Sequence, residues 1–248
     1  MFTLEVCANS VESAINAQKG GANRIELCEN LYVGGTTPSF GCIAETLNQL
    51  NIPVHVLIRP RPGDFVYSDM EFRQMLRDIE ACKKLGVKGV VSGILRANGT
   101  LDKERTKELV WAAKPMTFTF HRAFDIMPEP FKALNEIIEC GCNFLLTSGQ
   151  KNKAVDGLDL IRQLIAEGGN KIALIAGGGI NHSNILELAQ NGVNQFHMSG
   201  SEIVARYNTN HTGLSFVSAL LPENTVQQTN AETIASTVAK LKQYFNKK

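Results

Sequence analysis

The sequence has no long hydrophobic run and no marked excess of charge of either sign. It contains no window of about 18 consecutive apolar residues, so no membrane-spanning helix is expected. The formal net charge of the 248 residues is +1, which gives no indication of a nucleic-acid partner or of a membrane-surface partner. The first residues lack a basic segment followed by an apolar one, so no secretory signal is expected either.

Cysteine is sparse as well, and the number of cysteines indicates whether the protein is expected in a reducing or an oxidising compartment. Six cysteines in a chain of 248 residues without a signal segment are typical of reduced thiols in a cytoplasmic protein, and not of a disulfide framework. The apolar fraction of 44% and the charged fraction of 20% are those of an ordinary soluble globular protein. A chain of this length can form one α/β barrel without a second domain.

Two short stretches near the N-terminus indicate how the fold begins. Residues 3–7 and 24–28 both alternate apolar side chains with polar or thiol-bearing ones, which is the period of a strand. A helical pattern over residues 10–20 separates them, and a strand–helix–strand unit makes the two strands parallel. The aliphatic side chains are then expected to face covering helices. Two acids and two thiols share the opposite, inner face: Glu5, Cys7, Glu26 and Cys28.

The same alternation of strand and helix continues along the chain. Eight strands and eight helices in strict order predict a parallel sheet closed into a TIM (β/α)8 barrel, a single domain over residues 1–248. A long irregular segment at about 202–229 is expected between the last strand and the last helix. The remaining predicted strands cover 53–60, 89–94, 116–122, 144–148, 172–176 and 195–199, and the remaining helices cover 40–50, 69–85, 102–114, 128–140, 158–166, 183–190 and 231–245.

The thiols at the first two strands are candidate metal ligands. Cys7 and Cys28 occupy equivalent positions of neighbouring strands, which lie about 4.8 Å apart, so their sulfurs are expected to approach one another if the register allows. A soft thiolate pair suits Cu(I), whereas zinc needs four ligands and would require a histidine or a carboxylate to complete the set. The alternative is that both cysteines are small apolar side chains of the core.

Functional sites of such barrels lie at the carboxyl ends of the strands, and nearly every strand end here carries polar residues or glycines. His121 is a candidate general acid or base with Glu26 as its partner. The turn at 177–179 stands where many barrels bind phosphate. The alternative is an ion-pair layer, such as Glu5 or Glu26 with Arg59. The candidate substrate-binding residues are Arg59, Arg61, Asp64, Arg122, Asp125, Ser148, Gly177, Gly178, Gly179, His197 and Ser199.

Several longer motifs carry a resemblance to a known family. They are LEVC at 4–7, RIELC at 24–28, GGTTPS at 34–39, IRPRPGDF at 58–65, TFHRAFD at 119–125, LTSG at 146–149 and GGGI at 177–180. With these motifs the chain resembles the CutC family, named for copper homeostasis, from residue 3 to about 208. The resemblance implies a cytosolic TIM barrel that forms a homo-oligomer. In relatives, Cu(I) binding is attributed to the pair that matches Cys7 and Cys28.

Two functions follow from these observations. The first is a copper-handling protein in which Cys7 and Cys28 hold Cu(I) as thiolates at the barrel mouth. The second is an enzyme of lyase, isomerase or hydrolase type that acts on a small anionic or phosphorylated metabolite. A scaffold without catalysis is a plainer option, and the density of charge at the strand ends argues against it. The sequence does not decide whether the protein is an enzyme.

Overall fold

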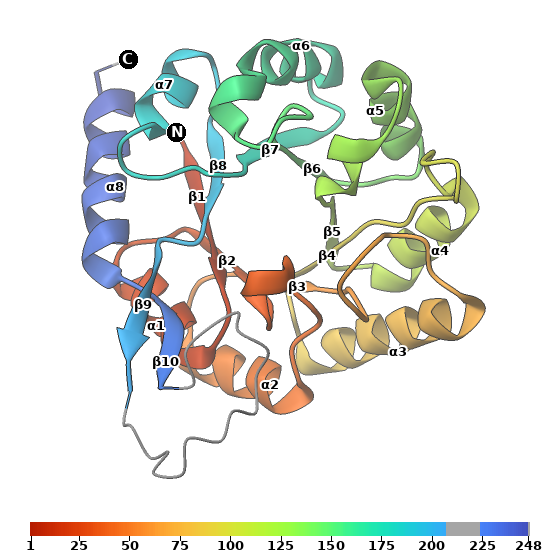
Figure 1. Ribbon diagram of the computed structural model, residues 1–248, viewed down its shortest axis with the longest axis horizontal. Helices are drawn as coiled ribbons and strands as arrows, with labels where there is room; N and C mark the ends of the chain where they lie inside the picture. The colour runs from red at the N-terminus through yellow and green to blue at the C-terminus, as the bar shows by residue number, and fades with distance from the viewer. Residues whose placement is uncertain (207–223, 248) are drawn as a thin grey trace.

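The computed structural model describes residues 1–206 and 224–247, and its centre is a closed barrel of eight parallel strands (Figure 1). Each strand pairs with the next one in the sequence, and β1 also pairs with β8, which closes the ring. The predicted TIM barrel is therefore confirmed. The strands are β1 (Thr3–Ala8), β2 (Arg24–Leu27), β3 (Val54–Leu57), β4 (Gly89–Ser92), β5 (Thr117–Phe120), β6 (Phe144–Thr147), β7 (Ala173–Gly177) and β8 (Gln195–Met198).

The α-helices of the described residues form a ring outside the barrel (Figure 1). None of them combines the length and the apolar character that crossing a bilayer requires. Ser10, Ser39, Ser68, Asp102 and Asn230 each cap a helix by accepting a hydrogen bond from the backbone N–H three residues later. The helices are α1 (Val11–Lys19), α2 (Phe40–Gln49), α3 (Asp69–Leu85), α4 (Lys103–Ala113), α5 (Pro130–Glu139), α6 (Leu158–Gly168), α7 (Ile185–Gln190) and α8 (Ala231–Phe245).

The strands place alternate side chains on opposite sides of the barrel wall, as the sequence pattern predicts. Leu4, Val6 and Ile25 belong to the main hydrophobic core, which also contains buried residues of the surrounding helices. A separate small cluster consists of Cys7, Cys28, Leu57 and Val91. Because these four side chains alternate with those of the main core, they lie on the inner side of the wall. The two thiols therefore face the interior of the barrel.

Two glycines make room for imidazole rings inside the barrel. A Cβ atom on Gly89 would lie 2.6 Å from Nε2 of His55. A Cβ atom on Gly93 would lie 2.6 Å from Nδ1 of His121. Both histidines are buried, so any larger residue at these glycines would displace a ring that has no solvent to move into.

The segment before α8 differs from the irregular structure predicted for 202–229. Strand β9 (Ser201–Ala205) pairs antiparallel with β10 (Thr225–Thr229), and residues 207–223 lie outside the described part of the chain. The hairpin rests on α1, where the backbone N–H of Thr229 donates to Oγ of Ser13 at 3.1 Å. Most of its side chains are partly exposed. A strand pair without a fully buried face leaves little periodic signal in the sequence, which explains why these two strands were not predicted.

Gly20, at the C-terminal end of α1, lies directly against α8 and provides a test of this packing. A Cβ atom there would lie 2.5 Å from Cβ of Ile234 and 2.7 Å from the carbonyl oxygen of Ala231. We expect Gly20→Ala to lower the free energy of unfolding by about 1–3 kcal/mol, because α8 has to shift. Denaturant unfolding measures the change.

Gly41 in α2 is the matched control, since a Cβ atom there meets nothing within 4 Å. Gly41→Ala should leave stability unchanged or raise it by about 0.5–1 kcal/mol, as expected for alanine in place of a helical glycine. Equal effects of the two substitutions would contradict the close contact between α1 and α8.

Candidate functional site

The two predicted thiols meet inside the barrel. Cys7 lies on β1 and Cys28 directly follows β2, and their Sγ atoms are 3.6 Å apart. Both side chains are buried, and neither forms a disulfide. Gly35 covers the pair with φ at +85°, and a Cβ atom there would lie 3.4 Å from Cβ of Cys28. The approach of the sulfurs that the strand pattern predicts is therefore confirmed.

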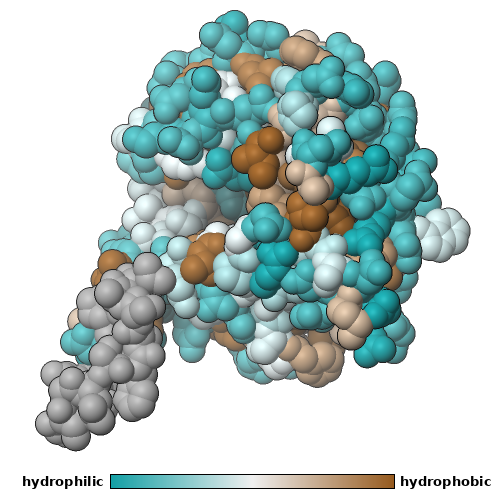
Figure 2. Space-filling view, turned by 45° about the vertical axis from the view of Figure 1, so that its right-hand side comes forward, coloured by the Kyte–Doolittle hydropathy of each residue, from teal (hydrophilic) through white to brown (hydrophobic). Residues whose placement is uncertain are grey.

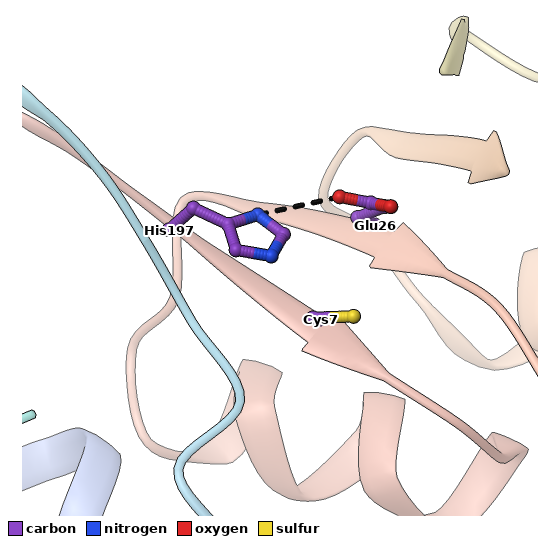
Figure 3. Close-up of side chains that lie close together, drawn as sticks. All are labelled: Cys7, Glu26 and His197. Carbon is purple, nitrogen blue, oxygen red and sulfur yellow. Dashed lines mark ion pairs between the residues drawn. The ribbon is translucent and has the colours of Figure 1, made fainter. Parts of the chain in front are cut away.

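Cys7 also forms part of a three-residue cluster with Glu26 and His197 (Figure 3). One ligand atom from each of the three residues lies within 4.8 Å of the others. The strand register produces this arrangement, because Cys7 on β1 pairs with Glu26 on β2, while Glu5 on β1 pairs with His197 on β8. The thiol pair is thus joined by a carboxylate and an imidazole, the two ligand types that a metal site with more than two ligands would need.

Glu5 lies one layer deeper in the barrel and organises this cluster. Its Oε2 accepts a hydrogen bond from Nε of Arg24 at 2.5 Å, and its Oε1 lies 2.8 Å from Nδ1 of His197. Burial alone would raise the pKa of Glu5, but Arg24 and His197 outweigh burial and hold this pKa well below its usual range. The expected alternative of an ion-pair layer is present, with Arg24 as the partner of Glu5 in place of Arg59.

The bond to Glu5 sets the orientation of the His197 ring. Because Nδ1 is directed at the Glu5 carboxylate, Nε2 is the ring nitrogen left for another partner, and Figure 3 shows it on the side that faces Cys7. Metal-binding histidines commonly hold a carboxylate through their second nitrogen in this way. Gly177 allows this placement, since a Cβ atom on it would lie 3.2 Å from Cβ of His197.

The protonation of the cluster depends on burial. Burial raises the pKa of Glu26 to about 7, although the nearby His197 opposes the shift. The Glu26 and Glu5 carboxylates raise the pKa of His197, although burial acts in the opposite direction. The hydrogen bond to Cys28, together with burial, raises the pKa of Cys7 well above its usual value. Without a metal, the Cys7 thiol therefore keeps its proton.

A cavity of about 290 Å³ opens beside this cluster and collects most of the predicted residues. Seven predicted side chains with charged, polar or thiol groups line it, together with a glycine turn and several apolar residues. Its lining includes Cys7, Glu26, Arg59, His121, Arg122, Gly178, Gly179, His197 and Ser199, with Leu31, Phe65 and Ile180 among its apolar members.

In the space-filling view, the surface shown is mostly hydrophilic, with small separate groups of hydrophobic residues (Figure 2).

Arg59 is a buried positive charge in the wall of this cavity. Its guanidinium donates to the backbone carbonyls of Val33, Gly35 and Gly63, and its Nε has no hydrogen-bond partner. Within the described residues, no carboxylate forms an ion pair with it. Phe65 lies under the guanidinium at 5.2 Å, a cation–π contact. Arg59 therefore gives this side of the mouth a positive charge that no acid of the described chain cancels.

His121 lies in the same wall as a neutral ring. Burial lowers its pKa to about 3, and the charge of Arg59 acts in the same direction. Its Nδ1 accepts a hydrogen bond from the backbone N–H of Ala123 at 3.2 Å, so the ring proton is on Nε2, which has no partner. The predicted partner Glu26 faces His197 instead, 3.3 Å away, and makes no hydrogen bond to His121. His121 is thus a hydrogen-bond donor.

Arg122, Asp125 and Ser148 form one connected group at the edge of the cavity. Nε of Arg122 donates to Asp125 at 2.7 Å, and its Nη2 donates to Oγ of Ser148 at 2.8 Å. Asp125 is held in turn by Thr147 and by the backbone N–H of Ser148 and Gln150. Asp125 and Ser148 do not line the cavity; they position Arg122, which does.

Arg61 and Asp64 lie outside the cavity. Arg61 pairs with Glu71 at 2.6 Å and with Asp64 at 3.1 Å, and the side chain of Asp64 is 67% exposed. They order the loop before α3. The structure thus separates the two arginines that the sequence placed together, because side chains two residues apart after a strand need not share a face once the strand has ended.

Sequence reasoning missed Arg24 and the role of His197 as a neighbour of the thiols. The alternation in residues 24–28 does place Arg24 on the same face as Glu26 and Cys28, so the signal for a buried arginine was present. His197 was assigned to substrate binding. Its approach to Cys7 depends on the closure of β8 onto β1, and a sequence pattern does not give that register.

The comparisons with known proteins show the family of this chain. A model of the CutC family matches residues 2–202. The chain belongs to the CutC family. It is 43% identical over 248 residues to a CutC family protein of Chromobacterium violaceum, with 98% of each chain covered. It is 46% identical over 199 residues to the copper homeostasis protein cutC homolog of Mus musculus, covering 80% of this chain and 73% of that one.

A solved structure of the CutC family shows the same fold. The crystal structure of CutC from Streptococcus agalactiae matches with a TM-score of 0.76 at 35% sequence identity, covering 80% of this chain and 99% of that chain. The family match includes both strand pairs that build the cluster, since Cys7, Glu26 and His197 all lie within residues 2–202.

The raised pKa of Glu26 predicts a dependence of stability on pH. A carboxyl group whose folded-state pKa is about 7, against an ordinary value of 4.5, contributes stability that is fully present below about pH 4.5 and is lost as pH rises through about 7. We expect Glu26→Gln to remove this loss. Relative to the wild type, the variant should gain up to about 3 kcal/mol in free energy of unfolding between pH 5 and pH 8, measured by denaturant titration.

Glu108→Gln is the control, because Glu108 is an exposed carboxylate on α4. It should follow the wild-type dependence on pH. If the free energy of unfolding of Glu26→Gln changes with pH as that of the wild type does between pH 5 and pH 8, the pKa of Glu26 is not raised in the folded protein.

Proposed function

We propose that this protein binds Cu(I) in copper homeostasis, and that Cys7 and Cys28 hold the ion as thiolates inside the barrel mouth. The observation that carries the proposal is the Sγ–Sγ separation of 3.6 Å between two reduced cysteines on adjacent strands. Soft thiolate ligands select Cu(I) over harder ions. The family, which includes a mouse relative named as a copper homeostasis protein, supports the same metal.

His197 is proposed as a third ligand through Nε2. Its other nitrogen, Nδ1, is engaged by Glu5, and this outer carboxylate keeps the ring in place. Glu26 lies in the same cluster and supplies a negative charge when it is ionised. Two thiols, an imidazole and a carboxylate also match the four ligands of zinc, so the choice between the two metals has to be measured.

Metal binding at this site must release protons. The Cys7 thiol has a pKa well above its usual value, so it is protonated before the metal arrives. A metal that takes the thiolate displaces this proton. The burial of both sulfurs also limits oxidation and exchange, since only the thiolate reacts and access is restricted.

The enzyme alternative gains no support from the comparisons. The matched relatives are named for copper homeostasis or for the family, and not for a reaction. The predicted acid–base pair is also not formed, because Glu26 faces His197 and the ring of His121 is neutral. We therefore propose no chemical step.

Titration of Cu(I) against a chromophoric Cu(I) chelator, under reducing and oxygen-free conditions, tests the proposal. The wild type should remove a single Cu(I) per chain from the chelator. The double variant Cys7→Ser, Cys28→Ser should not compete with the chelator at comparable affinity. The wild-type affinity should rise with pH by about ten-fold per pH unit for each proton released.

Cys42→Ser is the matched control, since Cys42 is a half-buried cysteine on α2 outside the cluster. It should bind Cu(I) as the wild type does. Full stoichiometry and affinity in the double variant would contradict the proposal. Tighter binding of Zn(II) than of Cu(I) at the same two cysteines would contradict the choice of metal.

A further inference from the structure

We infer that the mouth of the barrel also binds a phosphate group, held between Arg122, Arg59, His121 and the turn at Gly178 and Gly179. This site uses neither cysteine as a ligand, although Cys7 lines the same cavity. Its occupant is either free phosphate or the phosphate group of a small phosphate monoester. The cavity of about 290 Å³ sets the limit on the size of the whole ligand.

The glycine turn lines the cavity. The carbonyl of Gly178 accepts a hydrogen bond from the N–H of Ala154 at 2.9 Å, and the carbonyl of Gly179 accepts one from Nδ2 of Asn184 at 2.9 Å. Both carbonyls are therefore occupied, whereas the N–H of Gly179 makes no hydrogen bond within the described chain. Backbone N–H groups of such turns are common donors to bound anions.

Both glycines have φ values that other residues rarely adopt, +111° at Gly178 and +66° at Gly179. At Gly178, space is restricted too, since a Cβ atom would lie 3.3 Å from Cζ and from Nη1 of Arg122. The guanidinium thus lies directly beside the turn. Its Nε and Nη2 are used by Asp125 and Ser148, so Nη1 is the end left for a ligand.

Charge in this half of the mouth favours an anion. Arg59 is buried, lines the cavity and has no ion pair with any carboxylate of the described residues. A buried charge without a counter-charge is costly, and an anionic ligand would supply the missing partner. The side chain of Lys153 passes Gly179 and adds a second positive charge to this half, again without an ion pair in the described chain.

His121 is a second, independent indication of a ligand. Its side chain is 6% exposed, lines the cavity and carries a proton on Nε2 that no acceptor takes. Buried polar groups are normally hydrogen-bonded, so a buried donor without a partner beside a cavity indicates an acceptor that is absent from the chain itself. A ligand oxygen would satisfy it.

The arrangement of the donors favours phosphate over a carboxylate. A planar carboxylate is satisfied by one guanidinium fork. Here guanidinium, imidazole and backbone donors approach from separate walls, which suits the several oxygens of a tetrahedral anion. The turn also follows β7 and faces the end of β8, where barrels of this class frequently bind phosphate.

Isothermal titration calorimetry of the full chain at constant ionic strength tests the inference, with inorganic phosphate, methyl phosphate and acetate as probes. We expect saturable binding of phosphate and weaker binding of acetate. Arg122→Gln should weaken phosphate binding by roughly ten-fold or more, because it replaces a charge-assisted hydrogen bond with a neutral one. The variant Cys42→Ser, on α2 and outside the cavity, should bind phosphate as the wild type does.

Arg61→Gln is the matched control, because Arg61 lies at the same rim but outside the cavity. Saturable binding of both phosphate probes would support a phosphate monoester as the ligand, and binding of inorganic phosphate alone would support the free ion. The inference would be overturned by the absence of saturable binding, by equal losses in Arg61→Gln and Arg122→Gln, or by acetate binding as tightly as phosphate.

Discussion

The ion pair of Glu5 with Arg24 and His197 is the interaction on which the interior of this barrel depends. Its carboxylate is buried on β1, and its two oxygens bind a residue of β2 and a residue of β8. It therefore joins three strands at the place where the barrel closes. Removal of this one negative charge would leave Arg24 buried without a partner, which is strongly unfavourable.

The same carboxylate connects the fold to the cluster of Cys7, Glu26 and His197. By holding Nδ1 of His197, Glu5 leaves Nε2 directed toward Cys7, where Glu26 and Cys28 are also near. The positions of the thiols follow from hydrogen-bonded register in the sheet. The orientation of the His197 imidazole follows from its contact with the buried Glu5 carboxylate inside the barrel. Both are properties of the rigid barrel wall and not of a loop, so the site is preorganised before any ligand arrives.

The mouth has two halves of opposite chemical character. One half contains thiols and carboxylates, which suit a cation. The other half contains Arg59, Arg122 and a neutral His121, which suit an anion. Both halves line one cavity, so a cation and an anion could be held side by side, each lowering the electrostatic cost of the other. Burial lowers the pKa of His121, and the charge of Arg59 acts in the same direction, so the ring stays neutral beside the arginines.

Much of this architecture could be predicted from local sequence. The alternation in residues 3–7 and 24–28 was sufficient for the strands, the inner face and the approach of the two sulfurs, because period-2 patterning and parallel pairing are local rules. The contact of His197 with Glu26 and Glu5 could not be predicted, because His197 reaches them only through closure of the barrel. The hairpin of β9 and β10 was missed for a different reason, since it buries no complete face.

X-ray absorption at the copper edge of the Cu(I)-loaded protein tests the central claim most directly, because it reports the atoms bound to the metal. The account predicts sulfur scatterers in the first coordination shell of the wild type, and their loss in the Cys7→Ser, Cys28→Ser variant. A first shell of nitrogen and oxygen alone in the wild type, or an unchanged sulfur signal in the variant, would contradict it.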